Sequence, residues 1–383
     1  MRGTVLIVTM GIDYVAPARM PRELKQAGFR VGLIAPENAL ASHTRHVDFR
    51  GRFPEAPSLH DWTRTIANAV ETAAPELILP GDDFTVRTLL QLALAPPTEL
   101  VSMLDGGLGA LIGTSLGDAA RCLQAIDKTR LYEYAVAAGI AVADGGVATN
   151  STEAIAIAAR VGYPLVVRRD FGLSGSGVTR CPDDAAVRAA MSKAVPSSAW
   201  TPQSMPRFVV QRWIDGPIVT RPSLAWNGLE VAGFTRSRLA THPGPLGPGS
   251  VVQFVGIPAV AEATRALCAG LGIHGFAGTQ FLLDPESGQP LLVEINRRML
   301  PATHSGSRIG IDLAAALAAA SRGVPWTGPR DLPDGPGPRL ALFPQEWYRA
   351  PESRWLRELP CDMPWDDPAL LLAMTKAAFR APA

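Results

Sequence analysis

Residues 278–298 read GTQFLLDPESGQPLLVEINRR, and they are the most informative part of the chain. Two apolar runs, FLL and LLVEI, flank the sequence Asp-Pro-Glu-Ser-Gly, which is typical of a turn, so we predict a β-hairpin. If Leu283 pairs with Leu291 across the turn, Gln280 lies opposite Glu294. Directly opposed Cβ atoms lie ~5 Å apart, which is close enough for two side-chain oxygens to hold one Mg²⁺ ion.

Asn296 and Arg298 follow Glu294 at two-residue steps, so we expect all three on one face while the strand lasts. A half-buried strand has little reason to place Gln, Glu, Asn and Arg on one side unless a charged ligand lies there. For an isolated hairpin, a solvated sheet face is an equally good interpretation. The rest of the chain has to decide between them.

The composition describes a globular protein of roughly two to three domains, given 383 residues with 47% apolar and 19% charged residues. A net charge of +1 argues against nucleic-acid binding as the main activity. No apolar run approaches the ~20 residues that span a bilayer, so we expect no membrane partner. We expect a cytoplasmic protein for two reasons. The four cysteines are far apart and include no C-x-x-C pair, and the start of the sequence leaves no room for a signal peptide.

The first hundred residues alternate apolar strand-like runs at 5–9, 30–35 and 76–80 with helical stretches at 21–27, 62–72 and 84–94. This alternation predicts a parallel sheet with helices on both faces. Ligands of such sheets collect at the carboxyl ends of strands, where Asp82 and Asp83 follow the third run. These acids either cap a helix or line a substrate pocket. No G-x-G-x-x-G motif follows the first strand, which weakens a dinucleotide-binding role.

The middle of the chain predicts a helix from Lys128 to about residue 138, a strand near 140–143 and a helix begun by the capping-box-like Asn150 to Glu153. The strand PLVVRR then leads into the loop GLSGSG, whose backbone amides can approach phosphate oxygens. By itself this loop is better explained as a flexible turn. The run RFVVQRWIDGP predicts a strand and its exit, and residues 259–271 a helix.

Four of these pieces, in this order, resemble the ATP-grasp superfamily: Lys128 opening a helix, GYPLVVR before the glycine loop, VVQRWIDG, and the hairpin ending VEINRR. The resemblance covers roughly residues 1–325 and looks closest to the synthetase domains of carbamoyl phosphate synthetase. It implies an α/β fold with a Rossmann-like parallel-sheet domain (1–113), a small α+β lid lobe (114–210) and a larger α+β lobe carrying the hairpin (211–325). Residues 326–383, rich in Trp and Pro, form a C-terminal arm that folds back on the body and ends in a helix at 366–379.

The resemblance also implies a role for individual residues. Gln280, Glu294 and Asn296 become ligands of Mg²⁺, for which Mn²⁺ is a substitute. Arg298 stabilises charge on the transferred phosphoryl group, Arg168 contacts phosphate, and both count with Asn296 as catalytic residues. The implied ATP contacts are Lys128, Arg168, Gly172, Ser174, Gly175, Ser176, Gly177, Gln211, Arg212, Trp213 and Ile214.

Two positions depart from the pattern of the superfamily. Many members carry Glu where this chain has Gln280, and a Glu that holds the nucleotide ribose is common where this chain has Pro217 and Ile218. Gln still offers an oxygen to Mg²⁺, so neither change by itself implies an inactive enzyme.

These parts predict an ATP-dependent carboxylate–amine ligase that forms an acyl phosphate and releases ADP and phosphate, since no Ser-His or Cys-His pair is evident for an acyl-enzyme. A bicarbonate-activating synthetase and a non-catalytic ATP-binding protein remain open alternatives. The partners would be a small-molecule acid and amine, with a homodimer as a further expectation. The histidines other than His304 show no metal-ligand spacing and are interpreted as ordinary loop or surface residues. The candidate substrate contacts are Arg236, Arg238, His304, Ser305, Ser307, Arg308, Asp82 and Asp83.

Overall fold

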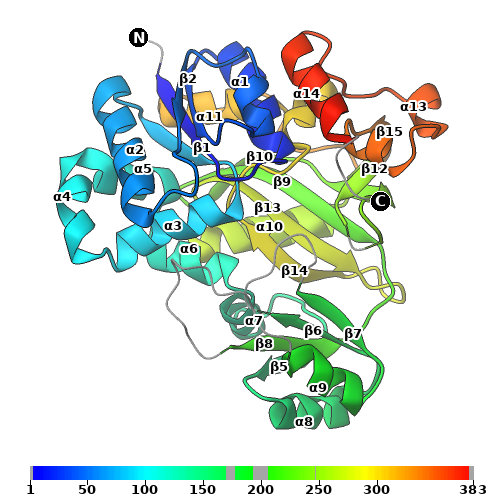
Figure 1. The fold of residues 1–383 in the computed structure, drawn as a ribbon. Helices are drawn as coiled ribbons and strands as arrows, with labels where there is room; N and C mark the ends of the chain where they lie inside the picture. Colours follow the sequence, from blue (N-terminus) through cyan, green and yellow to red (C-terminus); the bar gives the residue numbers. More distant parts are fainter. Residues whose placement is uncertain (1–2, 170–176, 193–205, 246, 379–383) are drawn as a thin grey trace.

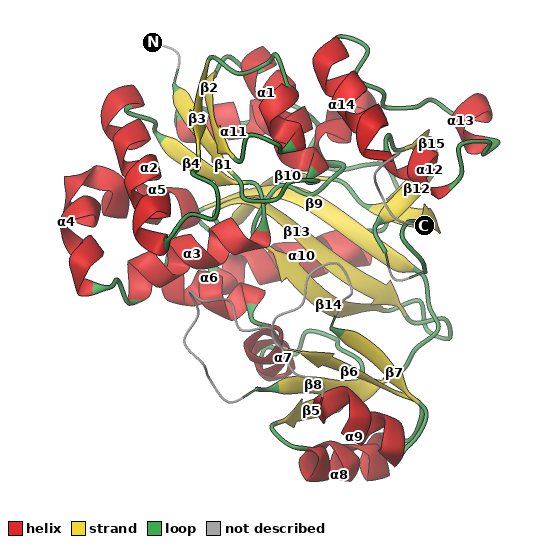
Figure 2. Cartoon of the chain, in the orientation of Figure 1, coloured by secondary structure: helices red, strands yellow, loops and turns green. Residues whose placement is uncertain are grey.

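The computed structural model describes residues 3–169, 177–192, 206–245 and 247–378. Three sheets follow one another along the molecule (Figure 1). An N-terminal sheet lies at one end, a small sheet lies at the other end, and a large sheet lies between them. Figure 2 shows the helices that cover the outer faces of these sheets.

The N-terminal sheet is parallel, with strand order β3-β2-β1-β4, as the alternation of strands and helices predicts. Val5 and Ile7 pack with α1 on one face, and Leu6 and Val8 pack with α2 and α3 on the other. The elements of this part are β1 (Thr4–Val8), α1 (Val15–Gln26), β2 (Arg30–Ala35), η1 (Leu40–His43), β3 (Phe49–Arg52), α2 (Leu59–Ala73), β4 (Leu77–Pro80), α3 (Asp83–Leu94), η2 (Thr98–Leu100), α4 (Val101–Met103), η3 (Leu104–Leu108), α5 (Gly109–Leu116) and α6 (Ala119–Ile126).

Two features of this sheet differ from the prediction. Helix α1 begins at Val15, before the predicted start near residue 21, because Val15, Ala16, Ala18 and Met20 all enter the core. Strand β3 was not predicted, since its sequence FRGR has no apolar run and its side chains are at most half-buried.

The small sheet is antiparallel, with strand order β5-β8-β6-β7, and α8 and α9 contribute to its core. The strand predicted near residues 140–143 lies instead at β5, where Gly145 approaches β8 so closely that a Cβ atom would lie 2.1 Å from the Val210 oxygen. Backbone approach, rather than apolar side chains, selects this strand. The elements are α7 (Lys128–Ala137), β5 (Gly145–Ala148), α8 (Ser151–Val161), β6 (Leu165–Arg169), β7 (Val178–Cys181), α9 (Asp184–Ser192) and β8 (Phe208–Arg212).

The large sheet has the strand order β14-β13-β9-β11-β12-β15, with β10 paired to β9. Helix α10 packs against one part of it, and α11 joins it to the core that also contains α1. The predicted helix at 259–271 is α10. The elements are β9 (Ile218–Trp226), β10 (Leu229–Gly233), β11 (Arg236–Thr241), β12 (Gly249–Gly256), α10 (Pro258–Leu271), β13 (Gly275–Leu283), β14 (Pro290–Asn296), η4 (Thr303–Ile309) and α11 (Leu313–Ser321).

The C-terminal arm consists of β15 (Gly335–Ala341), α12 (Gln345–Arg349), α13 (Trp355–Glu358) and α14 (Pro368–Ala378). Strand β15 adds to the edge of the large sheet beside β12. Three buried acids tie the arm to the body: Glu346 accepts a hydrogen bond from Ser250 (2.8 Å), Asp362 pairs with His304 (2.8 Å), and Asp367 accepts from Thr44 (2.7 Å).

Within the described residues no single helix has the length and hydropathy to cross a membrane. One bent pair of helical segments, 98–116 and 119–126, meets the requirement for a membrane span by length and composition alone.

Candidate functional site

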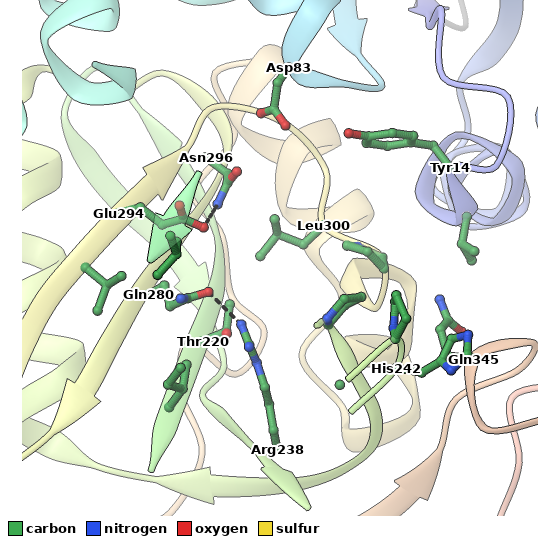
Figure 3. Close-up of a pocket in the computed structure, with 18 of the residues that line it drawn as sticks. Tyr14, Asp83, Thr220, Arg238, His242, Gln280, Glu294, Asn296, Leu300 and Gln345 are labelled. Atoms are coloured by element: carbon green, nitrogen blue, oxygen red, sulfur yellow. Dashed lines mark hydrogen bonds between the residues drawn. The ribbon is translucent and has the colours of Figure 1, made fainter. Parts of the chain in front are cut away.

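A cavity of about 1630 Å³ lies where the three sheets and the C-terminal arm meet (Figure 3). Among its described lining residues, nine are Lys or Arg and five are Asp or Glu. The chain as a whole carries a net charge of only +1, so positive charge is concentrated here. A cleft lined by excess positive charge attracts anions.

One rung of side chains crosses the cavity face of the large sheet. Glu294 pairs with Gln280, Gln280 with Thr220, and Thr220 with Arg236, on the neighbouring strands β14, β13, β9 and β11. Directly opposed residues point to the same face, and three strand spacings of ~4.8 Å give the rung a length of roughly 14 Å. All four residues line the cavity.

The hairpin register differs from the prediction near the turn but agrees at the site. Leu283 pairs with Pro290 rather than with Leu291, so the predicted pairing at the turn is wrong by one residue. A β-bulge then leaves Val293 as an extra residue, which restores the pair Gln280–Glu294. The expected juxtaposition is therefore correct, but a bulge produces it.

At the hairpin end of the rung, polar groups lie around Glu294. Its Oε1 accepts a hydrogen bond from Asn296 Nδ2 at 3.3 Å, and its Oε2 lies 3.8 Å from Lys128 Nζ. Burial lowers the pKa of Lys128, although the Glu294 carboxylate partly opposes this. The structure thus brings together Glu294, Asn296 and Lys128, as the sequence predicts.

Arg298 lies beside this group but already has an acid partner. Its Nε and Nη2 atoms each donate to the Asp83 carboxylate at 2.8 Å, and its guanidinium lies 5.3 Å from the centre of the Tyr14 ring. Burial alone would lower the pKa of Arg298, but the charge and hydrogen bond of Asp83, together with Tyr14 and Glu294, raise it. Nη2 also donates to Asn296 Oδ1 at 3.3 Å, which connects Arg298 to the hairpin.

The two neighbouring acids therefore have separate roles. Asp82 caps α3 by accepting from the Thr85 amide at 2.7 Å, and it also accepts from the Gly11 amide at 2.9 Å. Asp83 lines the cavity, whereas Asp82 does not. Of the two interpretations that the sequence left open, capping applies to Asp82 and pocket lining to Asp83.

Arg168 bridges the small sheet and the hairpin. Its Nη1 donates to the Val293 oxygen at 2.6 Å, at the bulge, and its Nη2 donates to Gln211 Oε1 at 2.5 Å. The side chain of Gln211 also donates to the Ala143 oxygen at 2.9 Å. Burial lowers the pKa of Arg168, with Glu294 opposing. Arg168 lines the cavity, but two of its nitrogens already donate hydrogen bonds to protein oxygens.

The strand exit after Gln211 also lines the cavity. Arg212, Trp213 and Ile214 form this wall, and the Trp213 amide donates to the Pro164 oxygen at 2.9 Å. Gly177 lines the cavity beside them. The predicted contacts Gly172, Ser174, Gly175 and Ser176 lie outside the described residues.

Arg236 and Arg238 both line the cavity but differ in their partners. Arg238 donates to Gln280 Oε1 at 2.7 Å and to the Gly247 oxygen at 3.0 Å (Figure 3). Arg236 is 8% exposed, its Nε has no partner, and no carboxylate of the described residues lies within ion-pair distance of it. Burial, together with the nearby Arg238 charge, lowers the pKa of Arg236 to about 9.

Comparison with known proteins supports the same fold. Residues 127–219 match the family model of the ATP-binding domain of the carbamoyl-phosphate synthase L chain. The carbamoyl phosphate synthase large chain of Thermus thermophilus is 27% identical over 247 residues, covering 62% of this chain and 23% of that protein. The large chain of Beutenbergia cavernae is 26% identical over 253 residues, covering 60% and 22%. The match therefore spans less than a quarter of the length of these relatives.

Solved structures match most of the chain. The biotin carboxylase domain of Hydrogenobacter thermophilus 2-oxoglutarate carboxylase, in complex with MgADP and bicarbonate, has a TM-score of 0.67 at 17% identity and covers 88% of this chain and 73% of its own. N5-carboxyaminoimidazole ribonucleotide synthetase with ADP has a TM-score of 0.62 at 13% identity, covering 86% and 79%. The chain has an ATP-grasp fold. The L-amino acid ligase of Bacillus licheniformis shares this ATP-grasp fold with a TM-score of 0.57 at 15% identity, covering 84% and 74%.

In this ATP-grasp chain, one predicted substrate cluster lies elsewhere. His304, Ser305, Ser307 and Arg308 form η4 and are not among the residues that line the cavity. His304 is buried against Asp362 of the arm, and burial together with the Arg19 charge lowers its pKa to about 4. The sequence places these residues after the hairpin, but the chain turns away from the cavity before η4 begins.

Other lining residues escaped the sequence analysis. Tyr14 follows β1, and Tyr348 and Leu372 come from the arm. The carboxyl end of β1 was a readable signal for Tyr14. His242, interpreted as an ordinary loop residue, also lines the cavity, and neither it nor the arm residues carry a sequence motif that marks them.

Proposed function

We propose that this protein is an ATP-dependent carboxylate–amine ligase that forms an amide through an acyl phosphate. The rung Glu294–Gln280–Thr220–Arg236 carries the proposal. One end of the rung offers oxygen ligands for a metal–phosphate complex, and the other end offers a buried cation that has no acid partner among the described residues. A phosphoryl donor and an acid acceptor would thus lie on one face of one sheet.

The nucleotide would be Mg-ATP, which the matched ATP-binding family model and the MgADP complex of the biotin carboxylase domain support. Gln280, Glu294 and Asn296 offer one carboxylate and two amide oxygens, and the described residues hold no cluster of three His, Cys, Asp or Glu side chains for a metal. Mg²⁺ bound with nucleotides commonly takes one or two carboxylates and completes its octahedron with phosphates and water. This donor set therefore fits Mg²⁺, or Mn²⁺, held jointly with ATP.

The remaining predicted contacts would hold the rest of the nucleotide. Lys128 and Arg168 lie in the cavity beside the hairpin and would contact phosphates, and Trp213 and Ile214 would flank the base. Ile218 lines the cavity where a ribose-binding Glu is common, so the ribose would be held by other groups.

In the proposed reaction, a carboxylate oxygen attacks the γ-phosphorus, the bond to the β-phosphate oxygen breaks, and ADP leaves. An amine nitrogen then attacks the carbonyl carbon of the acyl phosphate, loses a proton, and phosphate leaves. Mg²⁺ would neutralise phosphate charge, and Lys128 and Arg298 would stabilise charge on the transferred group. Asp83 and Tyr14 orient Arg298 for this task.

Activation of bicarbonate is a second candidate, because the chain resembles carbamoyl phosphate synthases and a carboxylase domain in complex with bicarbonate. The size of the cavity favours an organic acid. At about 1630 Å³ it exceeds the ~300–1,000 Å³ of usual small-molecule sites, and bicarbonate would add little to the volume of ATP.

The direct test is to screen acids and amines for ADP release and to identify the products by mass spectrometry. We expect ADP and phosphate in equal amounts with an amide product. AMP and pyrophosphate would contradict the acyl-phosphate route, and phosphate release that needs only bicarbonate would favour the second candidate. Binding of Mg-ATP without ADP release from any pair would indicate a non-catalytic protein.

The hairpin offers a matched pair of variants for this assay. Glu294→Gln should lower kcat by about 10²–10³-fold, because it removes the single carboxylate of the proposed metal site. Glu286→Gln, in the exposed turn of the same hairpin, should leave kcat unchanged. Equal activity of both variants would show that the hairpin does not hold the metal.

A further inference from the structure

The end of the cavity beside the C-terminal arm contains large apolar side chains that remain exposed. Ile12 is 46% exposed and Leu372 is 54% exposed, and both line the cavity. Ile12 comes from the loop after β1, and Leu372 from α14 at the other end of the chain. Exposed apolar side chains that meet in a concave site mark a place where a ligand buries apolar surface.

Further apolar groups complete this wall. Pro243 and Pro248 of the loop after β11, Tyr348 of α12 and Ala373 of α14 line the same cavity. The His242 ring centre lies 6.1 Å from that of Tyr348. Ile12, Pro243, Pro248, Tyr348, Leu372 and Ala373 are called the arm chamber below.

The arm chamber is held in place by hydrogen bonds that do not involve its apolar surface. The Leu342 amide donates to the Ser250 oxygen at 2.8 Å, which fixes the arm against the start of β12. The Tyr348 hydroxyl donates to the Met374 oxygen at 2.6 Å, which fixes α12 against α14. The Arg45 amide donates to Asp367 at 3.0 Å, which fixes the start of α14 against the N-terminal part. A wall fixed before the ligand binds loses little entropy on binding.

The arm chamber adjoins Arg236, the cation that has no acid partner among the described residues. His242 follows β11, the strand that carries Arg236 and Arg238, and α12 packs against β11 and β12. Figure 3 shows Arg238 between two groups of lining residues, with Gln280, to which it is hydrogen-bonded, and Glu294 on one side and His242 and Gln345 on the other. A ligand with an anionic head at Arg236 and Arg238 would therefore have the arm chamber beside it.

We propose that the arm chamber binds the side group of the acid substrate, and that this acid carries a bulky aliphatic or aromatic group. In the part of the chain that the structure describes, one cavity thus holds a cation without an acid partner and apolar side chains that remain exposed. The identity of the site as an acid site rests on the proposed function. The apolar selectivity rests on Ile12, Leu372 and their neighbours.

The test measures binding rather than turnover. The full-length protein is saturated with Mg²⁺ and a non-hydrolysable ATP analogue, and three acids are titrated by calorimetry: 3-phenylpropionate, propionate and 6-aminohexanoate. We expect 3-phenylpropionate to bind about ten- to a hundredfold more tightly than the other two, the range that a buried apolar group typically adds. Equal affinity for the three acids, or no binding of 3-phenylpropionate, would overturn the proposal.

Variants locate the effect. Leu372→Asp and Ala373→Trp should each weaken 3-phenylpropionate binding tenfold or more and leave propionate and nucleotide affinity unchanged. Trp365→Asp is the matched control, because Trp365 is 72% exposed on the same arm but does not line the cavity. If Leu372→Asp behaves like Trp365→Asp, the arm chamber does not bind the acid.

Two further outcomes separate the explanations. If 3-phenylpropionate binds as expected but no acid–amine pair releases ADP, the ligase proposal fails and the arm chamber stands. If Leu372→Asp changes the oligomeric state in sedimentation analysis while acid affinity stays the same, the exposed apolar residues contact a second copy of the chain, and the proposal is overturned.

Discussion

Arg221 and Arg236 lie on neighbouring strands of the large sheet, and both are buried, yet their surroundings are opposite. Arg221 donates to Glu230 at 2.8 Å and to Asp331 at 2.9 Å, and although burial opposes it, these acids raise its pKa. Among the described residues Arg236 has no such acid partner, and burial lowers its pKa to about 9.

The difference separates a structural cation from one that is placed for a ligand. A buried charge that is fully paired is part of the fold, and removal of one partner is costly. A buried charge that lacks a counter-ion destabilises the fold unless an anion arrives. Arg236 lines the cavity and Arg221 does not, so the unpaired cation is the one that a ligand can reach.

The first prediction tests the structural half of this comparison. Arg221→Met should lower the free energy of unfolding by about 3–5 kcal/mol, because Glu230 would remain buried without its cation. Urea denaturation measures this loss. Arg265→Met is the control. Arg265 is exposed, and its ion pair with Asp331 is long, at 3.7 Å, so its replacement should change stability by less than ~0.5 kcal/mol. A loss below ~1 kcal/mol for Arg221→Met would contradict a structural role.

The second prediction tests the other half. Arg236→Met should leave the free energy of unfolding unchanged or raise it, because it removes a buried charge that has no acid partner among the described residues. The same variant should weaken acid binding about ten- to a hundredfold, since a hydrogen bond to a charged group contributes ~1.5–3 kcal/mol. Denaturation and calorimetry on one preparation measure both. A stability loss as large as that of Arg221→Met would make Arg236 structural.

Arg298 is an intermediate case, because it has one acid partner and also lines the cavity. Asp83→Asn would remove the charge that orients Arg298 but keep a hydrogen-bonding side chain. We expect kcat to fall by about tenfold with little change in the KM for ATP, because a misplaced catalytic group affects the transition state more than binding. Steady-state kinetics measure this split. An unchanged kcat would show that Asp83 does not position Arg298.

The sequence predicted the parts of the fold that have a local pattern. The apolar runs of β1, β2 and β4 alternate with helices, and this alternation correctly predicts a parallel sheet. Strand β9 was missed although it lies in the middle of the large sheet. It contains Arg221 and Pro222, and both argue against a central strand when the acids that pair with Arg221 are unknown.

The candidate site divides in the same way. The pair Gln280–Glu294 was predicted from a pairing at the turn that is wrong by one residue, and only the bulge at Val293 restores it. Asn296 lies beside Glu294 as expected from the two-residue period of strands. The pair Asp83–Arg298 joins residues 215 positions apart, and no local pattern predicts which of two adjacent acids makes it. The arm chamber depends on packing between the two ends of the chain, and short apolar and polar stretches of the arm do not encode that packing locally.

The last prediction concerns a buried titratable side chain, His304. This histidine faces Arg19 from α1, Asp362 from the arm and Arg308 from its own segment, and burial first, then Arg19, lowers its pKa to about 4. The pKa of an unfolded histidine is ~6.5, so between pH 6.5 and 4 the unfolded chain binds one more proton at this position. Stability is therefore lost as the pH falls through this window, by at most ~1.4 kcal/mol per pH unit.

His274 adds to this loss with the same sign, because burial lowers its pKa to about 4 as well. His304→Asn should therefore reduce the slope of unfolding free energy against pH, between pH 6.5 and 4.5, by up to the amount that one bound proton contributes. The contribution of His274 to the slope should remain. Replacement of the exposed His60 by Asn should leave the slope unchanged. Urea denaturation at several pH values gives the three slopes. Equal slopes for the wild type and His304→Asn would show that His304 does not stay neutral in the folded protein, and that the arm is not held by a neutral histidine bound to Asp362.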